Sequence, residues 1–170
     1  TKLPGCHKLT GEVRLLFQFP RLFRGLTIEE NVRAGLRDPL RENMLRSILP
    51  IPAARESGAR FTVQQLLKKV DLTSLSNRYP HELSFGQRKL ASVVQLLAGN
   101  PSVVLLDEPF AALDGDAAMT LTSLLAENQK AGAIAILVEH DLQHIDALKT
   151  PRKFRIEAGR IMPLSERGRS

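Results

Sequence analysis

The feature that most limits the fold of this chain is an uninterrupted apolar run, Val103 to Leu106, which ends directly at two acidic residues. A run that is apolar at every position predicts a strand buried on both faces, which is typical of a parallel sheet between helices. A second such run spans Ile134 to Val138 and is followed by Glu139 and His140. Two buried strands separated by a helix-length segment predict an α/β fold.

The rest of the patterning predicts a helical first half and an α/β second half. The expected elements, in chain order, are a strand over 13–17, a helix capped by Thr27, an irregular or weakly helical insert over 38–58, a helix capped by Thr62, a helix after Gln87, a helix from Asp114 to Gly132, a short helix over 141–149 and a hairpin around Ala158-Gly159. We therefore expect a helical subdomain near 26–98 and a part of an α/β core over 99–170.

Composition excludes several classes of protein. The net charge is +6, but the basic residues are scattered, and a chain with one Tyr and no Trp has few rings on which bases could stack. We therefore expect no nucleic-acid partner. No apolar run approaches the ~20 residues that a membrane-spanning helix needs. The single cysteine, Cys6, excludes an internal disulfide and fits a reducing compartment.

Two carboxylates stand where the first buried strand ends. Ligands of parallel α/β sheets bind beyond the carboxyl ends of the strands, and unpaired carboxylates are unfavourable to bury there. We expect Asp107 to hold a magnesium ion, through water, and Glu108 to polarise or deprotonate an attacking water molecule. The alternative is a strand that simply reaches solvent at its acids; the adjoining Pro109 and the segment Ala112 to Asp114 favour the functional interpretation.

The segment Ser84 to Gln87 precedes a predicted helix. Backbone amides without partners and the positive end of the helix dipole favour an anion there. Gly86 would let a phosphate approach the backbone closely, and Ser84 adds a hydroxyl donor. The alternative is a serine that only caps the helix.

His140 and Gln18 each follow a predicted strand. A neutral His140 imidazole would be able to donate a hydrogen bond to a γ-phosphate and sense its loss. The spacing of His140 and His144 also imitates a zinc-binding helix, but His140 stands at a strand end and its neighbour is Asp141 instead of the longer Glu. Gln18 lies ahead of the helical insert, where it would touch the metal and relay the nucleotide state into the insert.

These segments, in their order along the chain, resemble the motifs of an ABC-type ATPase. Leu83 to Gln87 resemble the signature loop, Val103 to Pro109 the Walker B strand, and Glu139 to Asp141 the switch-histidine segment; Gln18 resembles the Q-loop residue and Ala111 to Asp114 the D-loop. The resemblance implies roles for these residues, namely Glu108, His140 and Gln18 in catalysis, Asp107 and Gln18 at the metal, and Ser84, Phe85, Gly86, Gln87 and Asp114 at the nucleotide.

Two departures from that family pattern stand out. Phe85 replaces the usual first glycine of the signature, and no Gly-x-x-x-x-Gly-Lys-Ser/Thr phosphate loop occurs anywhere in the sequence. Since every later motif is intact, we expect a P-loop NTPase-like parallel sheet with an inserted helical subdomain, in a fragment whose N-terminal part is missing and which alone is inactive.

The resemblance implies a subunit that binds and hydrolyses ATP with Mg²⁺ and powers solute import. Its implied partners are a second ATPase subunit, paired head to tail, and transmembrane permease subunits, at the cytoplasmic face of the inner or plasma membrane. The segments 17–23 and 26–32 resemble most the corresponding segments of ATP-binding subunits that serve importers of branched-chain amino acids or urea. The alternatives are a soluble ABC ATPase that acts on nucleic acid or ribosomes, and a non-catalytic fragment that lends only its signature to a partner's ATP site.

Overall fold

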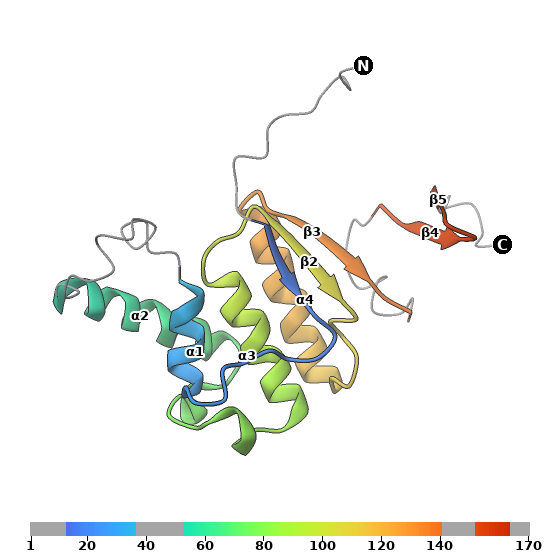
Figure 1. Cartoon of the computed structure of the whole chain (residues 1–170). Helices are drawn as coiled ribbons and strands as arrows, with labels where there is room; N and C mark the ends of the chain where they lie inside the picture. Colours follow the sequence, from blue (N-terminus) through green and yellow to red (C-terminus); the bar gives the residue numbers. More distant parts are fainter. Residues whose placement is uncertain (1–12, 37–52, 141–151, 164–170) are drawn as a thin grey trace.

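The computed structural model describes residues 13–36, 53–140 and 152–163. Figure 1 labels the main elements along the chain, which in full order are β1 (Val13–Leu16), α1 (Ile28–Gly35), α2 (Ala53–Lys69), η1 (Thr73–Leu75), η2 (Pro80–Glu82), α3 (Phe85–Leu97), β2 (Val103–Asp107), α4 (Gly115–Lys130), β3 (Ile134–Val138), β4 (Phe154–Glu157) and β5 (Arg160–Pro163). The expected helix over 141–149 lies outside the described residues.

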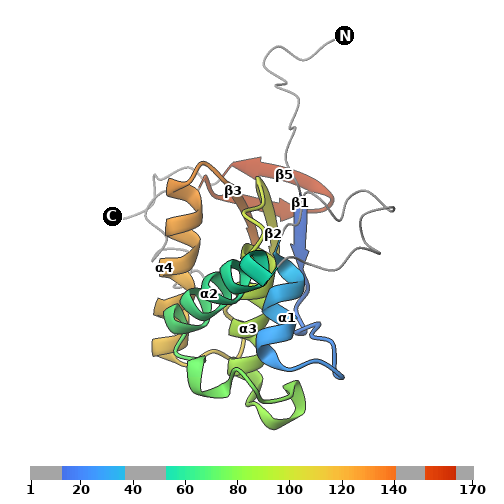
Figure 2. The ribbon, with the colours of Figure 1, turned by 90° about the vertical axis from the view of Figure 1, so that its left-hand side faces the viewer.

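The central sheet is parallel, as the sequence predicts. Its strand order is β1-β2-β3, and Leu16 lies opposite Leu106, which in turn lies opposite Leu137. The three strands therefore end at nearly the same level, so the residues that follow them gather at one edge of the sheet. Figures 1 and 2 show these strands running side by side.

Only one face of this sheet is covered by the described residues. Leu16, Val104 and Leu106 are buried on the side of α3 and α4. On the opposite side Leu15 is 48% exposed and Ile136 is 52% exposed. The expectation that 134–138 is buried on both faces is therefore wrong for the face that carries Ile136. Among the described residues, β3 pairs with β2 alone, and helices pack against one side of it only.

The helix expected to begin at Thr62 begins nine residues earlier. Helix α2 starts at Ala53, so residues 53–58 are regular helix, while 37–52 lie outside the described residues. Thr62 lies inside α2 and donates its hydroxyl hydrogen to the Gly58 carbonyl at 3.0 Å, so it caps nothing. By contrast, the Thr27 capping box of α1 is confirmed, with Glu30 as its reciprocal partner.

Helix α3 also begins earlier than expected. Its first residue is Phe85, and Ser84 is its N-cap, so Phe85 to Gln87 form the first turn instead of a loop ahead of the helix. The predicted apolar face of this helix is confirmed, because Leu90, Val93, Val94 and Leu97 are all buried.

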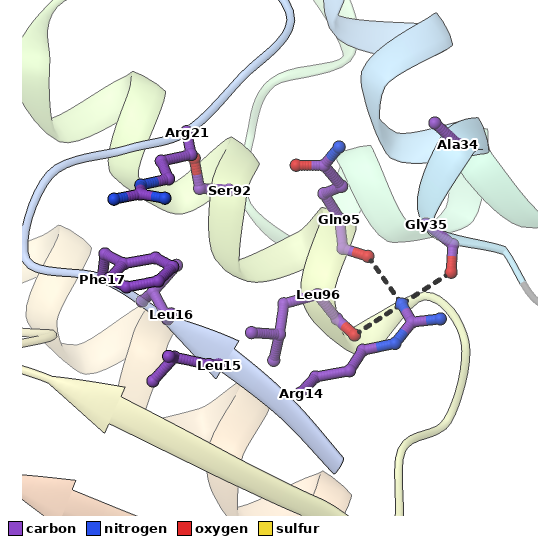
Figure 3. Close-up of a pocket in the computed structure, with 10 residues that line it drawn as sticks. All are labelled: Arg14, Leu15, Leu16, Phe17, Arg21, Ala34, Gly35, Ser92, Gln95 and Leu96. Carbon is purple, nitrogen blue, oxygen red and sulfur yellow. Dashed lines mark hydrogen bonds between the residues drawn. The ribbon is translucent and has the colours of Figure 1, made fainter. Parts of the chain in front are cut away.

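Arg14 joins β1 to the ends of two helices. Its guanidinium donates to the carbonyls of Gly35 (2.7 Å), at the end of α1, and Leu96 (3.0 Å), near the end of α3. Figure 3 shows this contact at the side of an open hollow of about 280 Å³. A cation at two helix C-termini is favoured by both dipoles, so Arg14 fixes β1 against the helical layer.

The second half follows the sequence closely. Asp114 caps α4 by accepting from the Ala117 amide, and Gly132, with φ of +94°, follows the end of that helix as expected. The predicted hairpin forms from β4 and β5, and Ala158 and Gly159 both adopt positive φ at its tip. Within the described residues, no helix combines the length and apolar character that a membrane crossing requires.

Candidate functional site

Three of the predicted catalytic residues meet at the carboxyl edge of the sheet. The side-chain amide of Gln18, after β1, donates to Oε2 of Glu108 at 2.7 Å. Nε2 of His140, after β3, lies 3.0 Å from Oε1 of the same carboxylate. Glu108 follows β2, between the other two strands, so both of its oxygens are held from opposite sides.

Glu108 is held in an uncommon backbone conformation. Its φ is +45°, in the left-handed region that residues with a Cβ seldom adopt, and Ala112 has φ of +60°. Each such residue costs ~1–3 kcal/mol, so the surroundings must hold the turn 108–112 in place. One support is the bond from the Glu108 amide to the Val138 carbonyl, at 2.9 Å, which ties the start of the turn to β3.

Two further side chains hold this turn, and sequence reasoning missed both. The Glu139 carboxylate accepts from the Phe110 amide at 2.9 Å. The ammonium of Lys89, on α3, donates to the carbonyls of Glu108 and Ala111. Lys89 is 1% exposed, and burial lowers its pKa, while the nearby carboxylates act in the opposite sense.

A signal for Lys89 was present in the sequence. Lys89 stands four residues before Val93, on the apolar face of a helix, where a charge needs a partner. Glu139 offered a weaker signal, since an acid after an edge strand usually reaches solvent.

Asp107, the expected metal residue, ends β2 and is exposed. No described residue donates a hydrogen bond to its carboxylate. The donor set at this edge is oxygen-rich: Asp107 and Glu108 are consecutive residues, and Gln18 uses its nitrogen for Glu108 and keeps its amide oxygen. Hard oxygen donors suit Mg²⁺, which takes few protein ligands and keeps waters or phosphate oxygens. The His140–His144 spacing that imitates a zinc helix is not tested, because His144 lies outside the described residues.

The start of α3 has amides available for an anion. The Ser84 hydroxyl oxygen accepts from the Gln87 amide at 3.2 Å, and the Gln87 side chain accepts from the Ser84 amide at 2.9 Å. Within the described residues, no acceptor is bound to the amides of Phe85 and Gly86. The Ser84 hydroxyl hydrogen is also available, so the cap and the anion site are compatible.

Asp114 is not part of the Glu108 cluster. One of its carboxylate oxygens accepts from the Ala117 amide at 2.8 Å and so caps α4. The predicted nucleotide contact of Asp114 would have to use its other oxygen. The start of α3 does approach this loop, because a Cβ built on Gly86 would lie 3.7 Å from the Leu113 side chain.

Comparison with solved structures supports the fold. An ATP-binding cassette, MJ0796, solved as a dimer in a post-hydrolysis state bound to ADP and Pi, aligns with a TM-score of 0.63 and 27% identity over 80% of this chain and 55% of that chain. A second dimeric structure of the same cassette aligns with a TM-score of 0.64. The α/β, P-loop NTPase-like fold expected from the sequence is therefore confirmed.

Curated relatives of this chain include sulfate/thiosulfate import proteins. The sulfate/thiosulfate import ATP-binding protein CysA of Nitrosomonas europaea is 39% identical over 150 residues, which cover 85% of this chain and 39% of that protein. A Chlorella vulgaris protein described as a probable sulfate/thiosulfate import ATP-binding protein CysA is 33% identical over 155 residues, which cover 90% of this chain and 59% of that protein. The chain thus spans about two-fifths of the length of the first of these relatives. The narrower assignment to branched-chain amino acid importers finds no support in these names.

A family model described as ABC transporter matches residues 2–111, a range that includes Gln18, Ser84 to Gln87 and Asp107-Glu108. This match agrees with the convergence of Gln18 and Glu108 and with the cap at Ser84. The chain belongs to the ABC transporter family.

Proposed function

We propose that this chain is the part of an importer's ATP-binding subunit that carries its catalytic base, and that Glu108 activates water for ATP hydrolysis. The observation that carries this proposal is the double hold on one carboxylate, by Gln18 at 2.7 Å and His140 at 3.0 Å. Three side chains from three strand ends would be an unusual outcome of packing alone at an exposed sheet edge. A base held from both sides is oriented before the substrate arrives.

The chemistry of the cluster fits general-base catalysis. Each oxygen of Glu108 retains a lone pair beyond its bond to Gln18 or His140, and so would accept a proton from a water molecule. A positioned general base contributes ~10²–10⁴-fold to a rate. Bound Mg²⁺ would neutralise charge on the phosphates, and Asp107, together with the Gln18 oxygen, is the group of this chain that would hold it.

The second half of the proposed site is the start of α3. We infer that the amides of Phe85 and Gly86, with the Ser84 hydroxyl, bind the phosphates of a nucleotide carried by another subunit in a head-to-tail pair. The dimeric state of the solved cassettes supports this arrangement. The 170-residue sequence contains no phosphate loop, so in this arrangement the loop that holds these phosphates belongs to the other subunit.

The proposed setting is the cytoplasmic face of a membrane, against a permease. Phe19 and Phe23, in the loop after Gln18, are 67% and 59% exposed. Exposed aromatic anchors beside the Gln18 loop are suited to receive a segment of a membrane subunit. For the solute we propose the sulfate or thiosulfate class, because the relatives described above are named for it.

The test is ATP hydrolysis by the product of the complete reading frame that contains this sequence. Glu108→Gln should keep nucleotide binding and lower kcat by ~10²–10³-fold, because the amide cannot take the proton. The matched control is Glu127→Gln, which removes an exposed carboxylate paired with Lys69 on the surface. Hydrolysis by Glu108→Gln at the rate of the control would exclude Glu108 as the base.

A non-catalytic role is the second candidate. It is favoured by one observation: the cap at Ser84 is intact while the sequence has no phosphate loop. On this view the chain would complete a partner's site and hydrolyse nothing with its own Glu108. Glu108→Gln would then leave the turnover of the assembled pair unchanged, whereas Ser84→Ala would lower it.

A further inference from the structure

The described residues contain one buried ammonium directly against the catalytic turn, that of Lys89. Building on the proposed function, we propose that Lys89 is a positioning residue: it fastens the turn 108–112 to helix α3 and so sets the direction of the Glu108 carboxylate. Lys89 would not touch nucleotide or water. It would act through the backbone of Glu108.

The contacts of Lys89 are concentrated on one turn. Its Nζ donates to the carbonyl of Glu108 and, at 3.1 Å, to the carbonyl of Ala111. The remaining face of the ammonium lies 5.9 Å from the centre of the Phe85 ring, within range of a cation–π contact. Both hydrogen-bond acceptors of Lys89 lie on this turn, so the side chain fastens the turn to α3.

The turn needs such a clamp. The two residues with positive φ, Glu108 and Ala112, stand at its two ends. Lys89 donates to the carbonyl of Glu108 and to the carbonyl of Ala111, the residue directly before Ala112. Backbone in this region persists only where surrounding contacts determine it. The Lys89 bonds therefore act at the two places where the turn would otherwise relax.

Burial of the ammonium argues against an incidental contact. A lysine that is 1% exposed gives up its hydration, and burial alone would disfavour its charged form. The negative charges of Glu139, Glu108 and Asp107 oppose that effect, so the lysine also balances the acidic edge of the sheet. An apolar side chain of the same length would fill the space without this penalty, so the charge itself has a use.

The same helix joins the clamp to the proposed anion site. Ser84 caps α3, and Lys89 follows five residues later on the first turns of that helix. Those five residues span ~7.5 Å along a helix axis. A displacement of α3 when a phosphate reaches Ser84 would move the ammonium and, with it, the Glu108 backbone. Lys89 would thus connect nucleotide bound at the start of α3 to the base of this chain.

The first experiment needs no nucleotide and uses the product of the complete reading frame that contains this sequence. Lys89→Met keeps the length of the side chain and removes the donors. We expect amide hydrogen exchange of residues 108–113 to become at least tenfold faster while the melting temperature stays the same or rises. Val94→Ala is the control, because Val94 is 1% exposed on the same helix and makes no hydrogen bond to the turn; it should lower the melting temperature without a selective change in exchange of residues 108–113.

Unchanged exchange in residues 108–113 of Lys89→Met would overturn the clamp. Lys89→Arg, which retains donors, should restore most of the protection. If Lys89→Met does not fold, Lys89→Gln answers the same question, because its single amide can reach one carbonyl at most; protection equal to that of the parent would then contradict the proposal.

The second experiment separates this inference from the proposed function. In the complete product, Lys89→Met should lower kcat at least tenfold and leave the KM for ATP within twofold, since binding and base positioning are distinct. If the parent hydrolyses no ATP, the proposed function fails, and the exchange data still decide the clamp. If the parent is active and Lys89→Met turns over at the parent rate, Lys89 is not a positioning residue.

Discussion

Replacing Asn31 should weaken the loop that carries Gln18 more than any surface substitution. Asn31 lies on α1, is fully buried at 0% exposure, and holds the loop from inside. Its Oδ1 accepts from the Phe23 amide at 2.8 Å, and its Nδ2 donates to the carbonyls of Phe23 (3.1 Å), Leu26 (3.1 Å) and Thr27 (2.9 Å). Asn31→Ala removes all four bonds at once.

The four bonds do not contribute equally. The Thr27 carbonyl still receives the Asn31 backbone amide, and the Phe23 carbonyl still receives the Leu26 amide, so both keep a partner. The Phe23 amide and the Leu26 carbonyl lose theirs. A net hydrogen bond contributes ~0.5–1.5 kcal/mol, and a buried group left unpaired costs ~1–3 kcal/mol. Because water partly relieves the two unpaired groups, we expect the free energy of unfolding to fall by ~3 kcal/mol. For a chain of this size that is a fall in melting temperature of ~6–12 °C.

The assay is urea unfolding of the 170-residue chain followed by circular dichroism, with amide exchange at Phe23 as the local readout. The control is Gln129→Ala, an exposed amide near the end of α4, which should change stability by less than ~0.5 kcal/mol. A loss below ~1 kcal/mol in Asn31→Ala, or an unchanged exchange rate at Phe23, would mean that the loop is held by something other than this network.

Three further predictions concern the helices α1 and α2. Gly35→Ala should destabilise the chain by ~2–3 kcal/mol in urea, because overpacking strains the contact of α1 with α3: the new Cβ would lie 1.9 Å from the Gln95 carbonyl oxygen. Gly58→Ala, with nothing near its Cβ, should instead raise stability by ~0.5–1 kcal/mol. Hydrogen bonds from the Thr27 amide and hydroxyl lower the pKa of Glu30, so its charge stabilises the fold above the ordinary glutamate pKa of ~4.3 and that contribution is lost as pH falls through the lower folded pKa. Between pH 7 and pH 3 the melting temperature of Glu30→Gln should therefore fall by less than that of the parent. An equal fall would show that the charge of Glu30 does not stabilise the fold.

What the sequence predicts well is what depends on neighbours along the chain. The caps at Thr27 and Asp114 join residues three positions apart, and both form. The cap at Ser84 also forms, but the sequence offered it only as the alternative and placed the start of that helix after Gln87. The start of α2 was missed for the opposite reason, because Pro50 and Pro52 suggested an irregular insert and Thr62-Val63-Gln64-Gln65 imitated a cap. A Thr hydroxyl bonded four residues back inside a helix looks the same in sequence as a capping Thr.

Contacts between distant segments were predicted only where chemistry required them. Gln18, Glu108 and His140 were expected at one site because the family resemblance gives all three roles around the same nucleotide and metal. Lys89 and Glu139 bind backbone groups of the same turn, but the sequence did not predict these contacts. The residues next to them along the chain do not indicate which distant carbonyl or amide they bind. The exposure of β3 likewise depends on which segments lie next to it, and this is not a property of its own apolar pattern.

The two halves of the proposed site depend on different parts of the fold, and this limits how each can fail. The cap at Ser84 is made within one helical turn and needs only α3. The cluster at Glu108 needs the register of three strands, because a shift of β3 by one residue would turn its side chains to the other face and move His140 away. Loosening of the half-covered sheet should therefore abolish base positioning before anion binding. Lys89 is the side chain on α3 that binds the Glu108 backbone, so it is the link through which order in the helix supports order in the turn.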